Sequence, residues 1–334
     1  VTLCHSVFGL SRHCIVPAML FRQFFFIVHV VRVSSVRLYT VEDDADKLLD
    51  RPMLAPLLQD RVLVNDLGEV SIVTIDTRRP AWTALKGYSD HDLLNVGADA
   101  VWENLGSKIV ILEDYLNQTE REHPNQLLVF IDGADVIYGG CPGSELAKIF
   151  HHTIRSGGND TSKPKVVLGA EMGAFPSRLM ARYRIFDERR KNTIKGRWNK
   201  LDYRDFADCS RTSGVLGPCS DPPFYQFGNT GFIMGTTRDV LHVLSGTIGY
   251  SNDQEGLIEY MLMHPEQVTL DYTGELVLAL HSLKDSVLDV EKNPETNATL
   301  MRNRVTGRIQ CFVHGSGNGK RRLRELATIL GEPY

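Results

Sequence analysis

The stretch that most constrains the fold is residues 126–140, QLLVFIDGADVIYGG. It begins with an unbroken apolar run of the kind found in a strand that is buried on both faces. Asp132 and Asp135 follow this run directly, and a second short apolar run ends in a Gly-Gly turn. A strand that delivers two carboxylates at its carboxyl end suits a hard cation such as Mg²⁺ or Mn²⁺. The alternative is a turn whose aspartates hydrogen-bond only to their own backbone.

The composition is that of an ordinary globular chain. Its 334 residues can form one large domain or two smaller ones, and 23% of them are charged while 43% are hydrophobic. The net charge of −4 offers no basic surface, so we expect no nucleic-acid partner.

The cysteines and the glycosylation sequons favour the secretory pathway. None of the six cysteines forms a CxxC pair, which argues against a zinc site. Cys209 and Cys219 bracket a Ser/Gly/Pro-rich loop and suggest a local disulfide, with two free thiols in a cytosolic loop as the alternative. Sequons begin at Asn117, Asn159 and Asn297. Together these features predict a protein of the endoplasmic reticulum or Golgi lumen, or a secreted one.

Two segments precede the first predicted strand. Residues 1–40 are apolar and basic, but polar and charged side chains interrupt their apolar core, so a clean membrane span is not expected. This segment is either a signal anchor or signal peptide, through which the chain would associate with a membrane, or a mispredicted leader. Residues 41–67 are polar and charged and suggest a linker or stem.

Strands that alternate with helices predict an α/β fold with a mostly parallel central sheet. Strands are predicted at residues 70–76, 126–132, 165–170, 227–235 and 267–271, with helical patterns after residues 106, 143, 237 and 256. Ligands of such sheets bind outside the carboxyl ends of the strands. Three predicted ends carry polar side chains: Thr74 with Asp76, Asp132 with Asp135, and Glu171. This coincidence indicates a pocket of the nucleotide-binding type.

A second motif lies near the end of the chain, where an apolar strand runs into residues 314–320, HGSGNGK. A neutral imidazole at His314 is a ligand for Mn²⁺-type metals. The backbone N–H groups of a loop containing Gly315 and Gly317 can cradle phosphate, and Lys320 adds a positive charge. The loop is not a Walker A sequence, and the alternative is a surface turn with a solvated lysine.

The order of these motifs resembles the glycosyltransferase domain of the multifunctional collagen lysyl hydroxylases, which has a GT-A type fold and uses a UDP-sugar and Mn²⁺. The similar segments, in chain order, are residues 130–140 (FIDGADVIYGG), 169–176 (GAEMGAFP), 228–235 (GNTGFIMG), 252–254 (NDQ), 270–272 (LDY), 314–320 (HGSGNGK) and 329–334 (ILGEPY). The resemblance covers residues 68–334, which would form one GT-A domain with an insertion at 187–224. Seven segments in one order are far more specific than any one of them.

The resemblance implies a role for each matching residue. The metal ligands would be Asp132, Asp135 and His314; Lys108, Lys320 and the Gly315–Gly317 loop would contact the diphosphate; Thr74 would lie against the uridine; Asp253, Glu171 and Asn229 would be catalytic, with Gln254 beside the donor sugar. A divalent cation and the lysines would stabilise the negative charge that develops on the leaving UDP. Asp253 or Glu171 would be the base for the acceptor hydroxyl.

The predicted activity is therefore metal-dependent transfer of glucose or galactose from a UDP-sugar to a protein or glycan hydroxyl. Hydroxylysine or galactosyl-hydroxylysine of a collagen-like protein is the acceptor that the resemblance suggests. This chain departs from the family pattern at Ala134, Phe175, Asn252 and Ser316, which replace an aromatic, a tryptophan, an acidic residue and an asparagine.

Two other functions compete with this prediction. The departures are also compatible with a weak or inactive GT-A domain that binds or scaffolds. A metal-dependent phosphohydrolase or nucleotidyltransferase would also use paired carboxylates, but the sequence lacks the second carboxylate cluster expected of two-metal chemistry.

Overall fold

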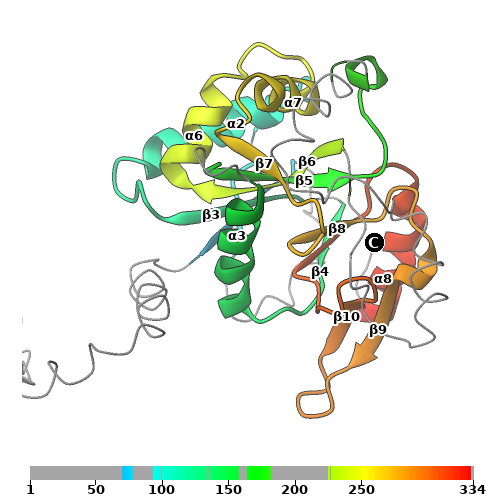
Figure 1. The fold of residues 1–334 in the computed structure, drawn as a ribbon. Helices are drawn as coiled ribbons and strands as arrows, with labels where there is room; N and C mark the ends of the chain where they lie inside the picture. The colour runs from blue at the N-terminus through cyan, green and yellow to red at the C-terminus, as the bar shows by residue number, and fades with distance from the viewer. Residues whose placement is uncertain are drawn as a thin grey trace, which may run out of the picture. The chain divides into compact units, whose positions relative to one another are not determined.

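Helices lie on both faces of a central sheet of hydrophobic strands (Figure 1). The computed structural model describes residues 70–77, 93–98, 100–133, 135–157, 164–180, 182, 225 and 227–331. All of them belong to one unit, Pro56–Tyr334. The predictions for residues 1–67, the 187–224 insertion, Ala134 and the Cys209–Cys219 pair lie outside the described residues.

The central sheet has six strands in the order β2-β1-β3-β6-β5-β7. Their bounds are β1 Ser71–Ile75, β2 Leu93–Asn95, β3 Leu127–Asp132, β5 Val166–Glu171, β6 Phe227–Thr236 and β7 Val268–Leu270. Five strands run in one direction and β6 alone runs against them. The predicted α/β class, with a mostly parallel central sheet flanked by helices, is confirmed.

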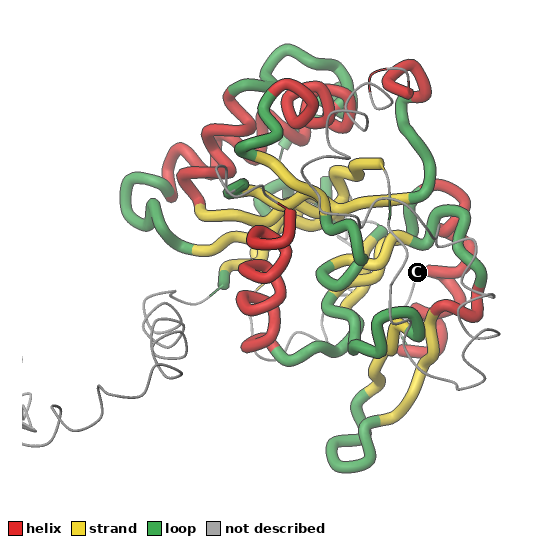
Figure 2. The backbone as a smooth tube through the Cα atoms, viewed as in Figure 1, coloured by secondary structure: helices red, strands yellow, loops and turns green. Residues whose placement is uncertain are grey.

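The sequence of strand β3 is apolar without interruption because the strand is buried on both faces. Leu128 and Phe130 pack in the core on one face of the sheet, while Leu127, Val129 and Ile131 pack in the core on the other face. The first face is covered by α2 (Ser107–Thr119), α6 (Thr237–Ser245) and α7 (Asp253–Met263), and the second by α3 (Gly143–Gly157) (Figures 1 and 2). Because both faces are buried, neither tolerates polar residues until the strand ends at Asp132.

A smaller sheet continues the fold beyond β3. It has the order β4-β11-β8, with β4 at Val136–Tyr138, β11 at Phe312–His314 and β8 at Val277–Ala279. Strand β11 is antiparallel to β4 and parallel to β8. The remaining elements are a hairpin of β9 (Leu288–Lys292) and β10 (Thr299–Asn303), helix α8 (Lys320–Leu330), and 3-10 turns at Ser177–Leu179, Asp285–Val287 and Gly317–Gly319.

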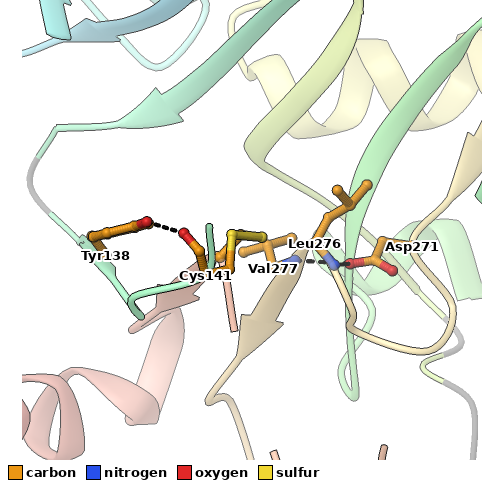
Figure 3. The surroundings of a disulfide bond; sticks show 6 residues. Tyr138, Cys141, Asp271, Leu276 and Val277 are labelled. Carbon is orange, nitrogen blue, oxygen red and sulfur yellow. Dashed lines mark hydrogen bonds between the residues drawn. A yellow bond between two sulfur atoms is a disulfide. The ribbon is translucent and has the colours of Figure 1, made fainter. Parts of the chain in front are cut away.

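A disulfide joins Cys141, just after β4, to Cys311, just before β11 (Figure 3). This pair was not predicted from the sequence. Nearby, the Tyr138 hydroxyl donates to the carbonyl of Cys141. The disulfide thus holds together two strands that are distant in sequence, one following the acidic motif and the other ending in His314.

In the described part of the chain, no helix combines the length and apolar character that a membrane crossing requires.

Candidate functional site

The predicted site residues gather where β1, β3, β5 and β11 end. Asp132 is the last residue of β3, Glu171 the last of β5 and His314 the last of β11. Thr74 lies in β1, where its hydroxyl donates to the carbonyl of Ile131 at 2.8 Å, one residue before Asp132. For β1, β3 and β5 these placements follow from strand direction, because parallel strands end at one edge of their sheet, whereas β11 belongs to the smaller sheet.

A buried lysine connects two predicted site carboxylates. The Lys108 Nζ lies 2.8 Å from Asp132 Oδ1 and 2.6 Å from Asp253 Oδ2. The hydroxyl of Thr230 also donates to Asp253 Oδ2, at 2.6 Å. The side chains of Lys108 and Asp253 are only 8% and 4% exposed, while that of Asp132 is 26% exposed. Lys108 therefore neutralises a carboxylate that water barely reaches.

The charges in this network determine its protonation. Burial alone would lower the pKa of Lys108, but the charges of Asp132 and Asp253 raise it well above the usual lysine value. Burial alone would raise the pKa of Asp253, but Lys108 and the Thr230 hydrogen bond hold it below the usual range. Both groups are consequently charged at neutral pH.

Lys108 contacts Asp253 because helices α2 and α7 begin next to each other. Lys108 is in the first turn of α2 and Asp253 opens α7, which is capped by the Asn252 side chain accepting from Glu255 N at 3.0 Å. The two helix starts touch at Gly106, whose N–H donates to the carbonyl of Ser251 at 3.0 Å. A Cβ at Gly106 would lie 2.0 Å from the Tyr250 carbonyl oxygen, so this approach needs glycine.

His314 lies beside Asp132. Its Nε2 is 3.9 Å from Asp132 Oδ2, and only 4% of the residue is exposed. Burial lowers the pKa of His314, and the charges of nearby carboxylates, with Asp132 the strongest, only partly oppose this. A neutral imidazole is the form that ligates metals. The ring packs against Gly231, where a Cβ would lie 2.2 Å from its Cε1.

Asp135 is held near His314 by the backbone. The N–H of Gly315 donates to the Asp135 carbonyl at 2.8 Å, and His314 is paired with Val136 across β11 and β4. The Asp135 carboxylate forms an ion pair with Lys320, with 2.8 Å between Nζ and Oδ2.

Of the predicted metal ligands, Asp132 and His314 lie close enough to share one ion. Among the residues that the structure describes, no group of three or more His, Cys, Asp or Glu stands ready to hold an ion. Both aspartates instead contact lysines. Two ligands of one ion, each about 2.1 Å from it, are at most about 4.2 Å apart, and the 3.9 Å between Asp132 and His314 satisfies this limit. A carboxylate and a neutral imidazole thus fit Mn²⁺ or Mg²⁺ chemically at Asp132 and His314, provided Asp132 shares or releases Lys108.

The remaining predicted catalytic residues form a second cluster. The Gln254 amide donates to Glu171 Oε1 at 2.9 Å and to the carbonyl of Gly228 at 3.0 Å. Asn229 uses its side-chain oxygen to accept from Gly231 N at 2.8 Å, which fixes the backbone beside His314. Gln254 follows Asp253 directly, so the start of α7 links this cluster to the Lys108 network.

The predicted phosphate loop forms a short turn before α8. Residues Gly317–Gly319 make a 3-10 turn, and Gly317 has a φ of +52°, a conformation that favours glycine. A Cβ at Gly315 would lie 2.7 Å from Leu323, so α8 packs directly on the loop.

Three residues of this region were assigned no role from the sequence. Thr230 and Gly231 lie within the segment 228–235, but nothing in the pattern distinguished them from structural residues. His281, which follows β8, contacts the terminal loop only through tertiary packing, so no local signal could have identified it.

Neither a family model nor a curated protein sequence matches this chain. Similar solved structures include a glycosyltransferase involved in the glycosylation of the major capsid of PBCV-1, at 12% identity and a TM-score of 0.40, covering 78% of this chain and 98% of that one. Another is A197 from STIV, at 11% identity and a TM-score of 0.29, covering 72% of this chain and 97% of that one. At these values neither neighbour indicates what this chain does.

Proposed function

We propose that this chain is a metal-dependent glycosyltransferase that moves glucose or galactose from a UDP-sugar to a hydroxyl acceptor. The observation that carries the proposal is the meeting of Asp132, from the acidic motif, with His314, from the glycine-rich motif, 3.9 Å apart at the strand ends. Two motifs far apart in sequence, each suited to part of a metal–diphosphate site, come together in the fold.

Lys320, together with the metal ion, would receive the leaving group. A bound Mn²⁺ or Mg²⁺ would act as a Lewis acid toward the diphosphate oxygens. Lys320, half-exposed at the end of the glycine-rich loop, can turn from Asp135 to a phosphate oxygen without desolvation. Lys108 is too buried to leave its two partners freely, so its role is to hold Asp132 and Asp253 in place.

Glu171 is a better candidate than Asp253 for the base that activates the acceptor. Asp253 already accepts from both Lys108 and Thr230, and its lowered pKa makes it a weak proton acceptor. Glu171 is engaged by the neutral Gln254 amide through one oxygen, Oε1. We assign Glu171 as the base and Asp253 as a positioning residue.

The acceptor we propose is hydroxylysine or galactosyl-hydroxylysine in a collagen-like protein, following the resemblance of the seven sequence segments. The Cys141–Cys311 disulfide supports an oxidising compartment such as the endoplasmic reticulum or Golgi lumen, or secretion.

A second candidate is a non-catalytic domain of the same fold. It is favoured by the ion pairs that already occupy both predicted metal-binding aspartates. Such a domain would bind a partner without turning over a sugar nucleotide.

The test is UDP release from UDP-glucose and from UDP-galactose by the full chain with Mn²⁺, with and without a hydroxylysine peptide. We expect peptide-stimulated release that Asp135→Asn abolishes and Glu171→Gln lowers by about 10²-fold or more in kcat, as for loss of a general base. Lys148→Met, on the exposed face of α3, is the control and should release UDP at the wild-type rate. Binding of UDP without release, with any metal, would instead support the non-catalytic candidate.

A further inference from the structure

The structure places the glycosylation sequons in different surroundings. Asn159 lies outside the described residues. Asn117 lies in the last turn of helix α2, and the hydroxyl of its sequon threonine, Thr119, already donates to the helix backbone at 3.1 Å. Asn297 lies in the loop of the β9–β10 hairpin, two residues before β10 begins. Of the two described sequons, only that of Asn297 is on a loop, where an N-linked glycan of a secreted protein is expected.

The loop around Asn297 is exposed and is shaped by hydrogen bonds within the hairpin. Residues 294–298 are all exposed. The N–H of Asn293 donates to the carbonyl of Ala298 at 2.8 Å, and the N–H of Asn297 donates to the carbonyl of Asn293 at 2.9 Å. A group attached to Asn297 therefore needs no packed side chain to move.

The backbone at Asn297 suits an asparagine. Its φ is +58°, in the left-handed region that asparagine enters more readily than most other side chains. Across the hairpin, Lys292 Nζ donates to the hydroxyl oxygen of Thr299, the third residue of the sequon, at 2.7 Å. Because this hydroxyl accepts from Lys292, its own hydrogen is left to donate to another group. The hydroxyl of Thr119 differs, since it donates within α2.

The Cys141–Cys311 disulfide supplies an independent observation. Disulfides form and persist in oxidising compartments, above all along the secretory pathway. N-linked glycans are carried by proteins that enter the same pathway. A crosslink in the fold and an exposed sequon on a loop thus indicate the same environment.

We propose that Asn297 carries an N-linked oligosaccharide. The donor is an oligosaccharide on a polyprenyl diphosphate, and a separate transferase performs the step. The side-chain nitrogen of Asn297 forms a bond to C1 of the first sugar, while the bond from C1 to the diphosphate oxygen breaks. The polyprenyl diphosphate leaves with that electron pair, and the amide proton passes to a base of the transferase. The inference rests on the proposed compartment and not on the proposed sugar-nucleotide activity.

The position of the hairpin leaves room for such a group. Figure 1 shows the closed end of the β9–β10 hairpin projecting from the body of the fold. A glycan is bulky and solubilising. At this end of the hairpin it would extend into solvent and leave the strand ends of the candidate site uncovered.

The test is mass mapping of tryptic peptides from the full chain, secreted by eukaryotic cells behind an added signal peptide. The added signal fixes the compartment, so a failure at this site is not confused with a failure of the proposed compartment. Trypsin releases Asn297 in residues 293–302 and Asn117 in residues 109–121. We expect a glycan on the first peptide, which peptide N-glycosidase removes to leave aspartate. The Cys141–Cys311 crosslink, mapped in the same digest without reductant, verifies passage through the oxidising compartment.

Three variants and a control make the assignment specific. Thr299→Ala removes the sequon hydroxyl and should abolish the glycan, whereas Thr299→Ser keeps a hydroxyl and should retain it. Asn297→Asp should also abolish it, because aspartate tolerates the positive φ but lacks the amide nitrogen. The control, Asn117→Gln, should leave the glycan on residues 293–302 unchanged. An unmodified peptide in crosslinked protein, or a glycan that persists in Thr299→Ala, would overturn the proposal.

Discussion

Replacing Lys108 by methionine tests whether the buried ion network stabilises the fold. Methionine keeps an unbranched side chain of similar length and removes only the ammonium group. Lys108 contacts Asp132 at 2.8 Å and Asp253 at 2.6 Å, and its side chain is 8% exposed. Removing one partner of a buried pair leaves an uncompensated charge, so we expect the free energy of unfolding to fall by about 3–5 kcal/mol.

The structure also says which carboxylate causes most of this loss. Asp253 is 4% exposed and would remain desolvated, whereas Asp132 is 26% exposed and can be hydrated. Adding Asp253→Asn to Lys108→Met should therefore recover about 2 kcal/mol, because a neutral amide can still accept from Thr230. Adding Asp132→Asn should recover less than about 1 kcal/mol.

The assay is equilibrium urea unfolding at neutral pH, followed by circular dichroism. The control is Lys148→Met, which breaks an ion pair with Glu145 of the same 2.8 Å length but with side chains 56% and 37% exposed. That change should cost at most about 0.5 kcal/mol. The reasoning is refuted if Lys108→Met costs no more than Lys148→Met, or if Asp132→Asn rescues as well as Asp253→Asn.

Three further predictions follow from packing, burial and the disulfide. Gly231→Ala should displace the adjacent His314 imidazole, which lowers the free energy of unfolding by about 1–3 kcal/mol and abolishes the Mn²⁺ binding that calorimetry measures. Gly235→Ala on the same strand, where the added Cβ has contacts of 3.0 Å or more, should leave metal binding intact. Burial raises the pKa of Asp271 to about 7, so its stabilising contribution is present at acidic pH and lost as pH rises through that value. Between about pH 5 and pH 8 the wild type should lose about 3 kcal/mol more than Asp271→Asn in urea unfolding, and equal losses would contradict this. Reducing Cys141–Cys311, which spans 170 residues, should lower stability by about 3–5 kcal/mol in unfolding with and without dithiothreitol, while an unchanged midpoint would refute the crosslink.

The sequence could reveal the long strands and their ends because their signals are local. The side chains of strand β3 pack in the cores on both faces of the sheet, so its apolar run and the position of Asp132 can be recognised in the sequence itself. The same holds for Glu171 at the end of β5 and for His314 at the end of β11. Each of these side chains ends an apolar run. The shared edge of the central sheet brings the ends of β3 and β5 together, while β11 reaches them from the smaller sheet.

The short strands and the partners of the site residues could not be predicted in the same way. Strands β2, β4 and β8 have three residues each, too few to show a period of two. The resemblance implied that Lys108 contacts diphosphate, which stays a prediction. Its partners in the structure are Asp132 and Asp253, which only the docking of α2 against α7 and β3 brings near. Long-range contacts of this kind leave no periodicity or spacing in the sequence.

The cysteines show the same difference between signals that are local in the sequence and contacts that depend on the fold. Cys209 and Cys219, close in sequence, suggested a disulfide, and they lie outside the described residues. The disulfide in the structure joins Cys141 to Cys311 because β4 and β11 are neighbours in the smaller sheet. That neighbourhood is a property of the topology.

We propose that Asp132, Asp135 and His314 form a metal-dependent site for a UDP-sugar. The most direct measurement is isothermal titration of UDP into the full chain with and without Mn²⁺, beside Asp135→Ala. We expect UDP to bind only when Mn²⁺ is present, and we expect the variant to bind neither metal nor nucleotide. Absence of UDP binding under both conditions, or equal binding by Asp135→Ala, would contradict it.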